Sequence, residues 1–350
     1  MSILIFILKV LGGLVGLIVI YMLIVMFAPG FSVPYQIPEL AKSKTNSAAP
    51  SVPGFRKDVT FDVEGAAIHA WLYLPEDLSQ KVPCIIMATG LGGTKNMILE
   101  SYAVRFREAG FAVLAFDYRF FGESGGEPRQ LIWMPHQLAD LEGAIKYARN
   151  LNEVDFEKIA LWGTSAGGAH VVTAAARDNK IACVSAMVPM LDPGFQADES
   201  EEDHSAWLSF KMFVHGQRDI ARSRFGLAPH RIPIVGKPGT VGLMTSADAY
   251  SDFVKLLPEN YNNQACARII LRAMLYRPVD TAQNIKCPVL LQLSKNDSLL
   301  PLKASEETIQ KLGDLAEVEY YSSGHFEIYT GENFERSVGE QTAFFKKHLL

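Results

Sequence analysis

The pentapeptide GTSAG at 163–167 places Ser165 between an apolar segment, IALW, and a segment with helical character, AGGAHVVTAAA. A serine on a tight turn from a strand to a helix is held out at the top of a sheet, and the small residues around it let the two segments approach closely. The pattern therefore predicts that Ser165 is a catalytic nucleophile. A purely structural turn is the alternative, because a GxSxG pattern alone also occurs by chance.

A serine hydroxyl is a weak nucleophile and needs a neighbouring base, which in turn needs an orienting carboxylate. His325 lies in the segment SGHF at 323–326, just past the last predicted strand, and Asp297 directly follows the apolar segment CPVLLQL. The chain order is serine, aspartate, histidine, each at the carboxyl end of a predicted strand. We therefore predict a catalytic triad of Ser165, Asp297 and His325.

An acyl-transfer site also needs two backbone N–H groups that face the developing oxyanion. One is predicted to be the amide of Ala166, the residue after the nucleophile. The other is predicted to be the amide of Leu91, in the loop TGLGG at 89–93 after the strand CIIMA. Gly90, Gly92 and Gly93 allow the backbone to approach a substrate closely, so we expect them to contribute to substrate binding.

Other chemical patterns in the chain are weaker. The sequence GTK at 93–95 departs from the nucleotide-binding pattern GxxxxGK[ST], because Asn96 stands where Ser or Thr is required. The loop at 117–126 is interpreted as a structural turn that shapes the floor of the pocket. His170, on the helix behind Ser165, is interpreted as a structural residue.

Strand and helix patterns alternate from Phe55 onward. Two segments with period-two alternation, 58–63 and 68–74, are predicted to form an antiparallel pair. The further strands are predicted at 82–88, 111–117, 158–163, 181–188, 287–293 and 317–322. Helices are predicted at 97–109, 136–150, 166–178, 303–313 and 333–348. This alternation predicts an α/β fold with a mostly parallel eight-stranded sheet and helices on both faces.

The region at about 191–286 shows no strand typical of the core and is predicted to be an inserted helical lid, with helices at about 247–257 and 263–276. It contains the acidic segment DESEED at 198–203, which we expect to be a solvated surface. The lid also carries aromatic residues that we expect to be exposed: Trp207, Phe210, Phe213, Phe225, Tyr250 and Phe253.

The amino-terminal segment contains nineteen uncharged residues from Val10 to Ala28. As a helix it would span about 30 Å, the thickness of the hydrocarbon core of a bilayer. We predict a single-pass membrane anchor at 1–28, and a cleaved signal peptide is the alternative. Residues 29–54 are rich in proline and are predicted to be an extended linker to the domain at 55–350.

The composition agrees with a folded domain: 49% of the residues are hydrophobic and 20% are charged. The net charge of −5 and the absence of a basic stripe argue against nucleic acid as a partner. The four cysteines form no metal-binding pattern and are expected to be buried free thiols. No metal or cofactor is expected.

Four segments together resemble the α/β-hydrolase superfamily: TGLGGTK, DYRFFGESGGEPR, GTSAGG and GHFEIY. Within it, residues 55–350 are similar to the branch of dienelactone hydrolases and Xaa-Pro dipeptidyl-peptidase-like proteins. The chain has a serine where dienelactone hydrolases have a cysteine, and Thr89-Gly90 where many members have His-Gly. The resemblance implies a serine hydrolase with the triad named above.

The expected reaction is hydrolysis of a carboxylic ester or thioester through an acyl-enzyme, on a hydrophobic small-molecule substrate. Amide or peptide hydrolysis and acyl transfer to an alcohol would use the same residues. A ligand-binding protein without catalytic activity is a further alternative from another class.

Overall fold

The computed structural model describes residues 2–28, 33, 54–193, 206–258 and 260–350. Its centre is an eight-stranded sheet in the order β1-β2-β4-β3-β5-β6-β9-β10, in which β2 is antiparallel to both neighbours and the other described pairs are parallel. The strands are β1 (Arg56–Val63), β2 (Ala66–Tyr73), β3 (Val82–Ala88), β4 (Ala112–Phe116), β5 (Val154–Thr164), β6 (Cys183–Met187), β9 (Val289–Ser294) and β10 (Ala316–Tyr321).

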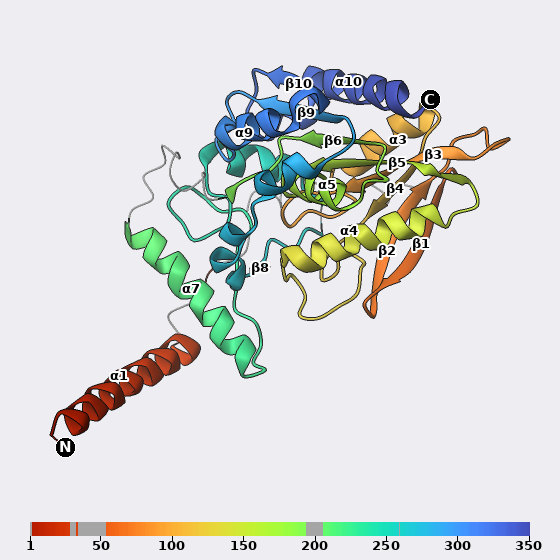
Figure 1. The fold of residues 1–350 in the computed structure, drawn as a ribbon. Coiled ribbons are helices and arrows are strands. Elements are labelled where there is room, and N and C mark those ends of the chain that lie inside the picture. Colours follow the sequence, from red (N-terminus) through yellow and green to blue (C-terminus); the bar gives the residue numbers. More distant parts are fainter. Residues whose placement is uncertain (1, 29–32, 34–53, 194–205, 259) are drawn as a thin grey trace.

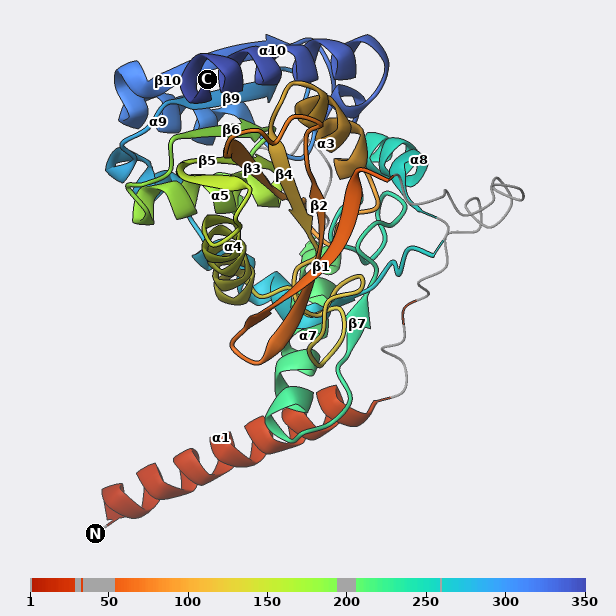
Figure 2. The ribbon, with the colours of Figure 1, turned by 90° about the vertical axis from the view of Figure 1, so that its right-hand side faces the viewer.

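Helices cover both faces of this sheet (Figures 1 and 2). One face packs against α3 (Leu99–Glu108) and α10 (Gly331–Leu349). The other packs against α4 (Met134–Arg149), α5 (Ala166–Arg177) and α9 (Leu302–Leu312). The predicted α/β class with a mostly parallel eight-stranded sheet is confirmed.

The central strand β3 shows why its sequence is a continuous apolar segment: every one of its residues is buried. Ile85 and Met87 pack into the core on one face, whereas Cys84, Ile86 and Ala88 pack into the core on the other. Strands buried on both faces lose the polar alternation of surface strands. The four cysteines are free and buried, at positions 84, 183, 266 and 287.

The chain between β6 and β9 departs from the predicted helices. It contains α7 (Ala206–Arg224), which the sequence analysis did not find, and a π-helical turn at Ala249–Phe253 that leads into α8 (Val254–Leu256). The helix predicted at 263–276 is wrong. That stretch holds β8 (Ala265–Cys266), paired with β7 (Arg231–Ile232), and the 3₁₀ turns Ala267–Leu271 and Ala273–Leu275, ahead of a further 3₁₀ segment at Pro278–Asn284.

Hydrogen bonds to other segments explain why 263–276 does not form a regular helix. The amide of Cys266 donates to Gln130, that of Ala267 to His230, and that of Arg268 to the carboxylate of Asp219. These donors are therefore committed to partners outside a helix.

Most of the expected aromatic surface is present. Trp207, Phe210, Phe213 and Phe225 are exposed. Contrary to prediction, Tyr250 is only partly exposed and packs against the core, and Phe253 is buried because it packs against Tyr261 and Phe326. The acidic segment at 198–203 lies outside the described residues, as does almost all of the predicted linker.

The helix α1 (Ser2–Phe27) projects from the body of the molecule (Figure 1). Its residues Ile3–Phe27 have a mean hydropathy of 2.9, so by length and composition this helix can cross a membrane. A signal sequence near an amino terminus has the same properties. The carboxyl end of α1 contacts α7.

Candidate active site

Ser165 lies in the turn between β5 and α5, with φ +53° and ψ −120°. A non-glycine residue in this region carries backbone strain of about 1–3 kcal/mol, which the surrounding structure must hold in place. Steric crowding explains why the pentapeptide has glycine at both ends. A Cβ at Gly163 would lie 2.3 Å from the carbonyl oxygen of Gly167, and a Cβ at Gly167 would lie 2.1 Å from the carbonyl oxygen of Ala88. Strand and helix thus meet too closely for any side chain at either position.

The structure brings the three predicted residues Ser165, His325 and Asp297 into one hydrogen-bonded chain. His325 Nε2 is 3.2 Å from Ser165 Oγ, and His325 Nδ1 is 2.7 Å from Asp297 Oδ2. The imidazole and the carboxylate are almost completely buried. With the proton on Nδ1 donated to the carboxylate, Nε2 is left as an acceptor that faces the serine hydroxyl.

The carboxylate of Asp297 is fixed from its other side. Its Oδ1 accepts hydrogen bonds from the amides of Leu299 at 2.9 Å and Leu300 at 2.8 Å. The His325 ring also makes an edge-to-face contact with Phe326, with the ring centroids 4.8 Å apart. Asp297 can therefore hold the orientation of the imidazole without a further side-chain partner.

The loop after β3 lies beside the serine. A Cβ at Gly90 would be 3.3 Å from the Cβ of Ser165, so this backbone passes within contact distance of the nucleophile position. Within the described part of the chain, neither the Leu91 amide nor the Ala166 amide donates a hydrogen bond. An oxyanion requires two such donors that face it, and the assignment of these two amides to that role stays a prediction.

The glycines of this loop face different neighbours. Gly90 and Gly93 line the cavity at Ser165, whereas Gly92 lines a separate cavity on the other side of the loop. Gly92 has φ +65°, and a Cβ there would lie 2.5 Å from the Ile234 side chain. Tyr261 Oη donates to the Gly92 carbonyl at 3.2 Å. The segment between β6 and β9 thus packs directly on the loop that carries Leu91.

The end of this loop is fixed by a buried ion pair that was not predicted from the sequence. Lys95 Nζ donates to Asp117 Oδ2 at 2.7 Å, and the Lys95 amide donates to Oδ1 of the same carboxylate at 2.7 Å. Glu123 is a second partner of the ammonium group. This contact supports the structural interpretation of the loop at 117–126. The sequence does place both residues near strand ends: Lys95 follows the glycine loop after β3, and Asp117 directly follows β4.

A small cavity of about 40 Å³ opens at Ser165. Most of the side chains that line it are apolar, and the segment between β6 and β9 supplies Met244, Phe253 and Leu256 to it. A water-sized group needs about 10–15 Å³ by this measure, so the cavity holds about three such groups. The separate cavity beside Gly92 measures about 410 Å³ and does not include Ser165 in its lining.

His170 is completely buried behind the site, as a structural residue is expected to be. Its two ring nitrogens are hydrogen-bonded to Tyr276 Oη at 2.8 Å and to Gln137 Oε1 at 3.0 Å. Desolvation by burial lowers the pKa of His170 to about 3, so the ring is neutral at physiological pH. Among the described residues, no group of three or more His, Cys, Asp or Glu side chains is placed to hold a metal ion.

A sheet of this order with a strained serine turn at the carboxyl end of its fifth strand defines the α/β-hydrolase class. The sequence pattern of the alpha/beta hydrolase fold family matches residues 83–217. The chain is also 38% identical over 299 residues to the quorum-quenching protein AidA of Acinetobacter baumannii, covering 85% of this chain and 96% of that relative. The chain therefore belongs to the alpha/beta hydrolase fold family.

More distant relatives carry names of two activities. The thiohydrolase aneE of Aspergillus aculeatus is 24% identical over 298 residues, covering 82% of this chain and 91% of aneE. The polyketide transferase ATR5 of Stachybotrys chlorohalonatus is 28% identical over 310 residues, covering 84% and 98% of the two chains. The crystal structure of the α/β hydrolase GrgF from Penicillium has a TM-score of 0.72 at 24% identity and covers 84% of this chain and 99% of GrgF, a likeness of fold.

Proposed function

We propose that this protein is a serine hydrolase in which Ser165 attacks an ester-type carbonyl. The observation that carries the proposal is the hydrogen-bonded chain from Asp297 through His325 to Ser165 Oγ. As Oγ forms its bond to the carbonyl carbon, the Ser165 proton passes to His325 Nε2. Asp297 stabilises the resulting imidazolium, and the oxyanion accepts hydrogen bonds from the amides of Leu91 and Ala166.

The imidazolium then donates its proton to the leaving alkoxide or thiolate, whose bond to the carbonyl carbon breaks. This leaves an acyl group on Ser165. In the second half-reaction His325 takes a proton from water, the hydroxide attacks the acyl carbon, and the proton returns to Ser165 as the carboxylic acid is released. The proposed mechanism uses only these residues, the substrate and water.

The substrate is proposed to be a carboxylic ester or thioester with a short apolar acyl group. The apolar lining and the volume of the cavity at Ser165 favour such a group over a charged or long one. A relative named as a thiohydrolase supports the thioester variant. Similarity to the dienelactone-hydrolase and Xaa-Pro dipeptidyl-peptidase-like branch stays a prediction, as does amide hydrolysis.

Acyl transfer is the second candidate, because several relatives are named as polyketide transferases. In that reaction an alcohol replaces water as the acceptor of the acyl group on Ser165. A product assay with an added alcohol distinguishes the two reactions: hydrolysis yields the free acid, whereas transfer yields a new ester.

The test is a screen of p-nitrophenyl esters of graded acyl length and the matching thioesters. We expect turnover by the wild type and by Ser251→Ala, a matched control because Ser251 is an exposed serine outside the cavity lining. Ser165→Ala should lose about 10⁴-fold or more of the activity. Turnover by Ser165→Ala near the wild-type rate would overturn the proposal, and an absence of turnover by the wild type across the screen would favour a ligand-binding protein.

We also infer that α1 is retained in the mature protein as a single-pass anchor. The support is a specific contact: Arg218 and Arg222 of α7 donate to main-chain carbonyls at the carboxyl end of α1. A cleaved signal peptide would leave these arginines without those acceptors. Flotation of the full-length protein with lipid vesicles, and its intact mass, test this inference.

A further inference from the structure

The helix α7 lies across the carboxyl end of α1 (Figures 1 and 2). Arg218 Nη1 donates to the carbonyls of Val25 at 2.9 Å and Ala28 at 2.8 Å, and Arg222 Nη1 donates to that of Met26 at 3.0 Å. The last carbonyls of a helix have no partner within it and carry partial negative charge, so two guanidinium groups are well suited to this end. The contact fixes where α1 leaves the folded domain.

Helical spacing extends this contact surface along α7. Trp207, Lys211, Arg218 and Arg222 follow one another at intervals of four, seven and four residues, which places them on one stripe of the helix. Lys211 Nζ lies 5.4 Å from the centroid of the Trp207 ring, and 62% of Trp207 is exposed. The stripe that holds the end of α1 therefore continues into an exposed tryptophan and a lysine.

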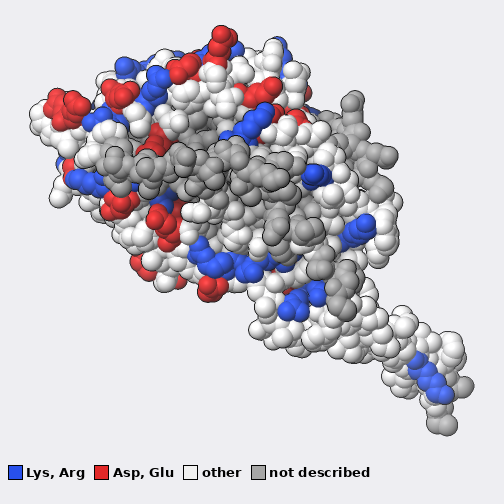
Figure 3. All heavy atoms as spheres, turned by 180° about the vertical axis from the view of Figure 1, so that it is seen from behind, with Lys and Arg blue, Asp and Glu red and all other residues white. Residues whose placement is uncertain are grey.

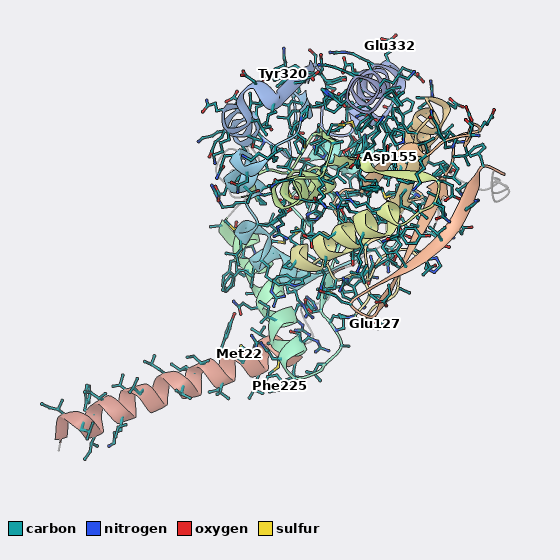
Figure 4. The ribbon with its side chains drawn as sticks, turned by 45° about the vertical axis from the view of Figure 1, so that its right-hand side comes forward. Met22, Glu127, Asp155, Phe225, Tyr320 and Glu332 are labelled. Carbon is teal, nitrogen blue, oxygen red and sulfur yellow. The ribbon has the colours of Figure 1, made fainter. Side chains whose placement is uncertain are left out.

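More exposed aromatic residues accompany this stripe. Trp207 stacks on Phe210 with ring centroids 5.6 Å apart, and Phe210, Phe213 and Phe225 are all exposed. Figure 4 labels Phe225, which directly follows α7, on the side of the molecule from which α1 projects. Lys and Arg side chains also gather at the base of the projecting helix (Figure 3). We call Trp207, Phe210, Lys211, Phe213 and Phe225 the α7 surface.

We propose that the α7 surface lies in the headgroup region of the bilayer that α1 spans, in contact with phospholipid headgroups and the first carbons of their acyl chains. Tryptophan and basic side chains are the residues that favour this region, the former for its amphipathic ring and the latter for anionic lipids. The end of a membrane-spanning helix marks the level of the interface. Because α7 is bonded to that end, its surface is held at the same level.

This placement gives the segment between β6 and β9 two contacts at once. Its α7 rests on the membrane surface, while Met244, Phe253 and Leu256 of the same segment line the cavity at Ser165. The buried pair of Asp219 on α7 and Arg268 beside β8 joins these two parts, with Arg268 Nε 2.6 Å from Asp219 Oδ2. The cover of the cavity is thereby fixed against the bilayer.

The inference rests on the retained anchor proposed above, and lipid quenching of Trp207 fluorescence tests it separately. The full-length protein is placed in vesicles of phosphatidylcholine and phosphatidylserine, with or without lipids brominated near the headgroup end of the acyl chain. The emission of Trp207 is the difference between the wild type and Trp207→Phe. The control carries Phe156→Trp in the Trp207→Phe background, because Phe156 is 55% exposed on β5 and its neighbour Asp155 lies far from α1 in Figure 4.

We expect brominated lipid to remove about half or more of the Trp207 emission and to leave that of the tryptophan at position 156 nearly unchanged. Protein that floats with the vesicles but whose Trp207 is unquenched would overturn the inference while leaving the anchor intact. If that emission is also blue-shifted, a protein partner or a second copy of the chain covers the surface. Failure to float would overturn both the anchor and the inference.

Discussion

Replacement of Asp297 by asparagine tests the proposed role of the triad through the tautomer of His325. Two amides, those of Leu299 and Leu300, donate to Oδ1 of the carboxylate, and these donors require an oxygen. In Asp297→Asn the carbonyl oxygen therefore stays with the two amides, and the NH₂ group faces His325 Nδ1. Nδ1 must then accept, so the ring proton moves to Nε2, which faces Ser165 and can no longer take its proton.

A triad with the wrong tautomer loses about 10⁴-fold in rate, which corresponds to about 5.5 kcal/mol of transition-state stabilisation. The assay compares kcat/KM for a p-nitrophenyl ester with the melting temperature of each variant. Because the hydrogen bonds to Leu299 and Leu300 are retained, we expect the melting temperature to change little. Asp252→Asn, at a partly exposed carboxylate that pairs with Lys255, is the matched control. A loss of activity below about tenfold in Asp297→Asn would show that Asp297 does not set the tautomer of His325 for catalysis.

Three further predictions concern packing and protonation. Gly167→Ala should destabilise the protein by about 3 kcal/mol or more in thermal unfolding, because its Cβ would lie 2.1 Å from a backbone oxygen. Gly339→Ala, in the helix α10 with open space around it, should instead stabilise by about 0.5–1 kcal/mol, and equal effects of the two would contradict the packing argument. His170 stays neutral in the folded state while the unfolded chain binds a proton below about pH 6.5, so its contribution to stability should fall by about 2 kcal/mol from pH 7 to pH 5. Denaturant titrations should show that loss in the wild type and a smaller one in His170→Gln; an identical loss in both would refute the assignment. Iodoacetamide should label no cysteine in the native protein and all four in denaturant, whereas labelling of the native protein would contradict their burial.

The fold was predictable where one physical rule determines the local pattern. β3 and β4 are buried on both faces, so their sequences are the continuous apolar segments that are typical of central strands. The order of Ser165, Asp297 and His325 after successive strands likewise follows from the topology of a parallel sheet, in which the carboxyl ends of the strands meet at one edge. These residues are far apart in the sequence yet adjacent in space.

The segment between β6 and β9 was less predictable because its local sequence does not mark its buried face. In α7 the exposed side includes Trp207 and Phe210, whereas the buried side includes His215 and Asp219. An apolar stripe therefore points away from the core. Arg268 is buried and forms an ion pair with Asp219. The two residues are far apart in the sequence, so no local pattern specifies this contact.

The sequence also did not predict which neighbours each glycine of the loop at 89–93 faces. Gly90 approaches Ser165, whereas Gly92 packs under Ile234 and Tyr261, because the chain turns between them at the positive φ of Gly92. The buried contact of Lys95 with Asp117 holds the following turn. Tertiary contacts decide these orientations, since a run of glycines has few local preferences of its own.

A covalent probe tests whether Ser165 is the nucleophile. The full-length protein is treated with a fluorophosphonate, and the modified peptide is identified by mass spectrometry. We expect one adduct, on Ser165, whose formation slows strongly in Asp297→Asn and is abolished in Ser165→Ala. Protein that remains unlabelled, or an adduct of equal yield in Ser165→Ala, would contradict this role of Ser165.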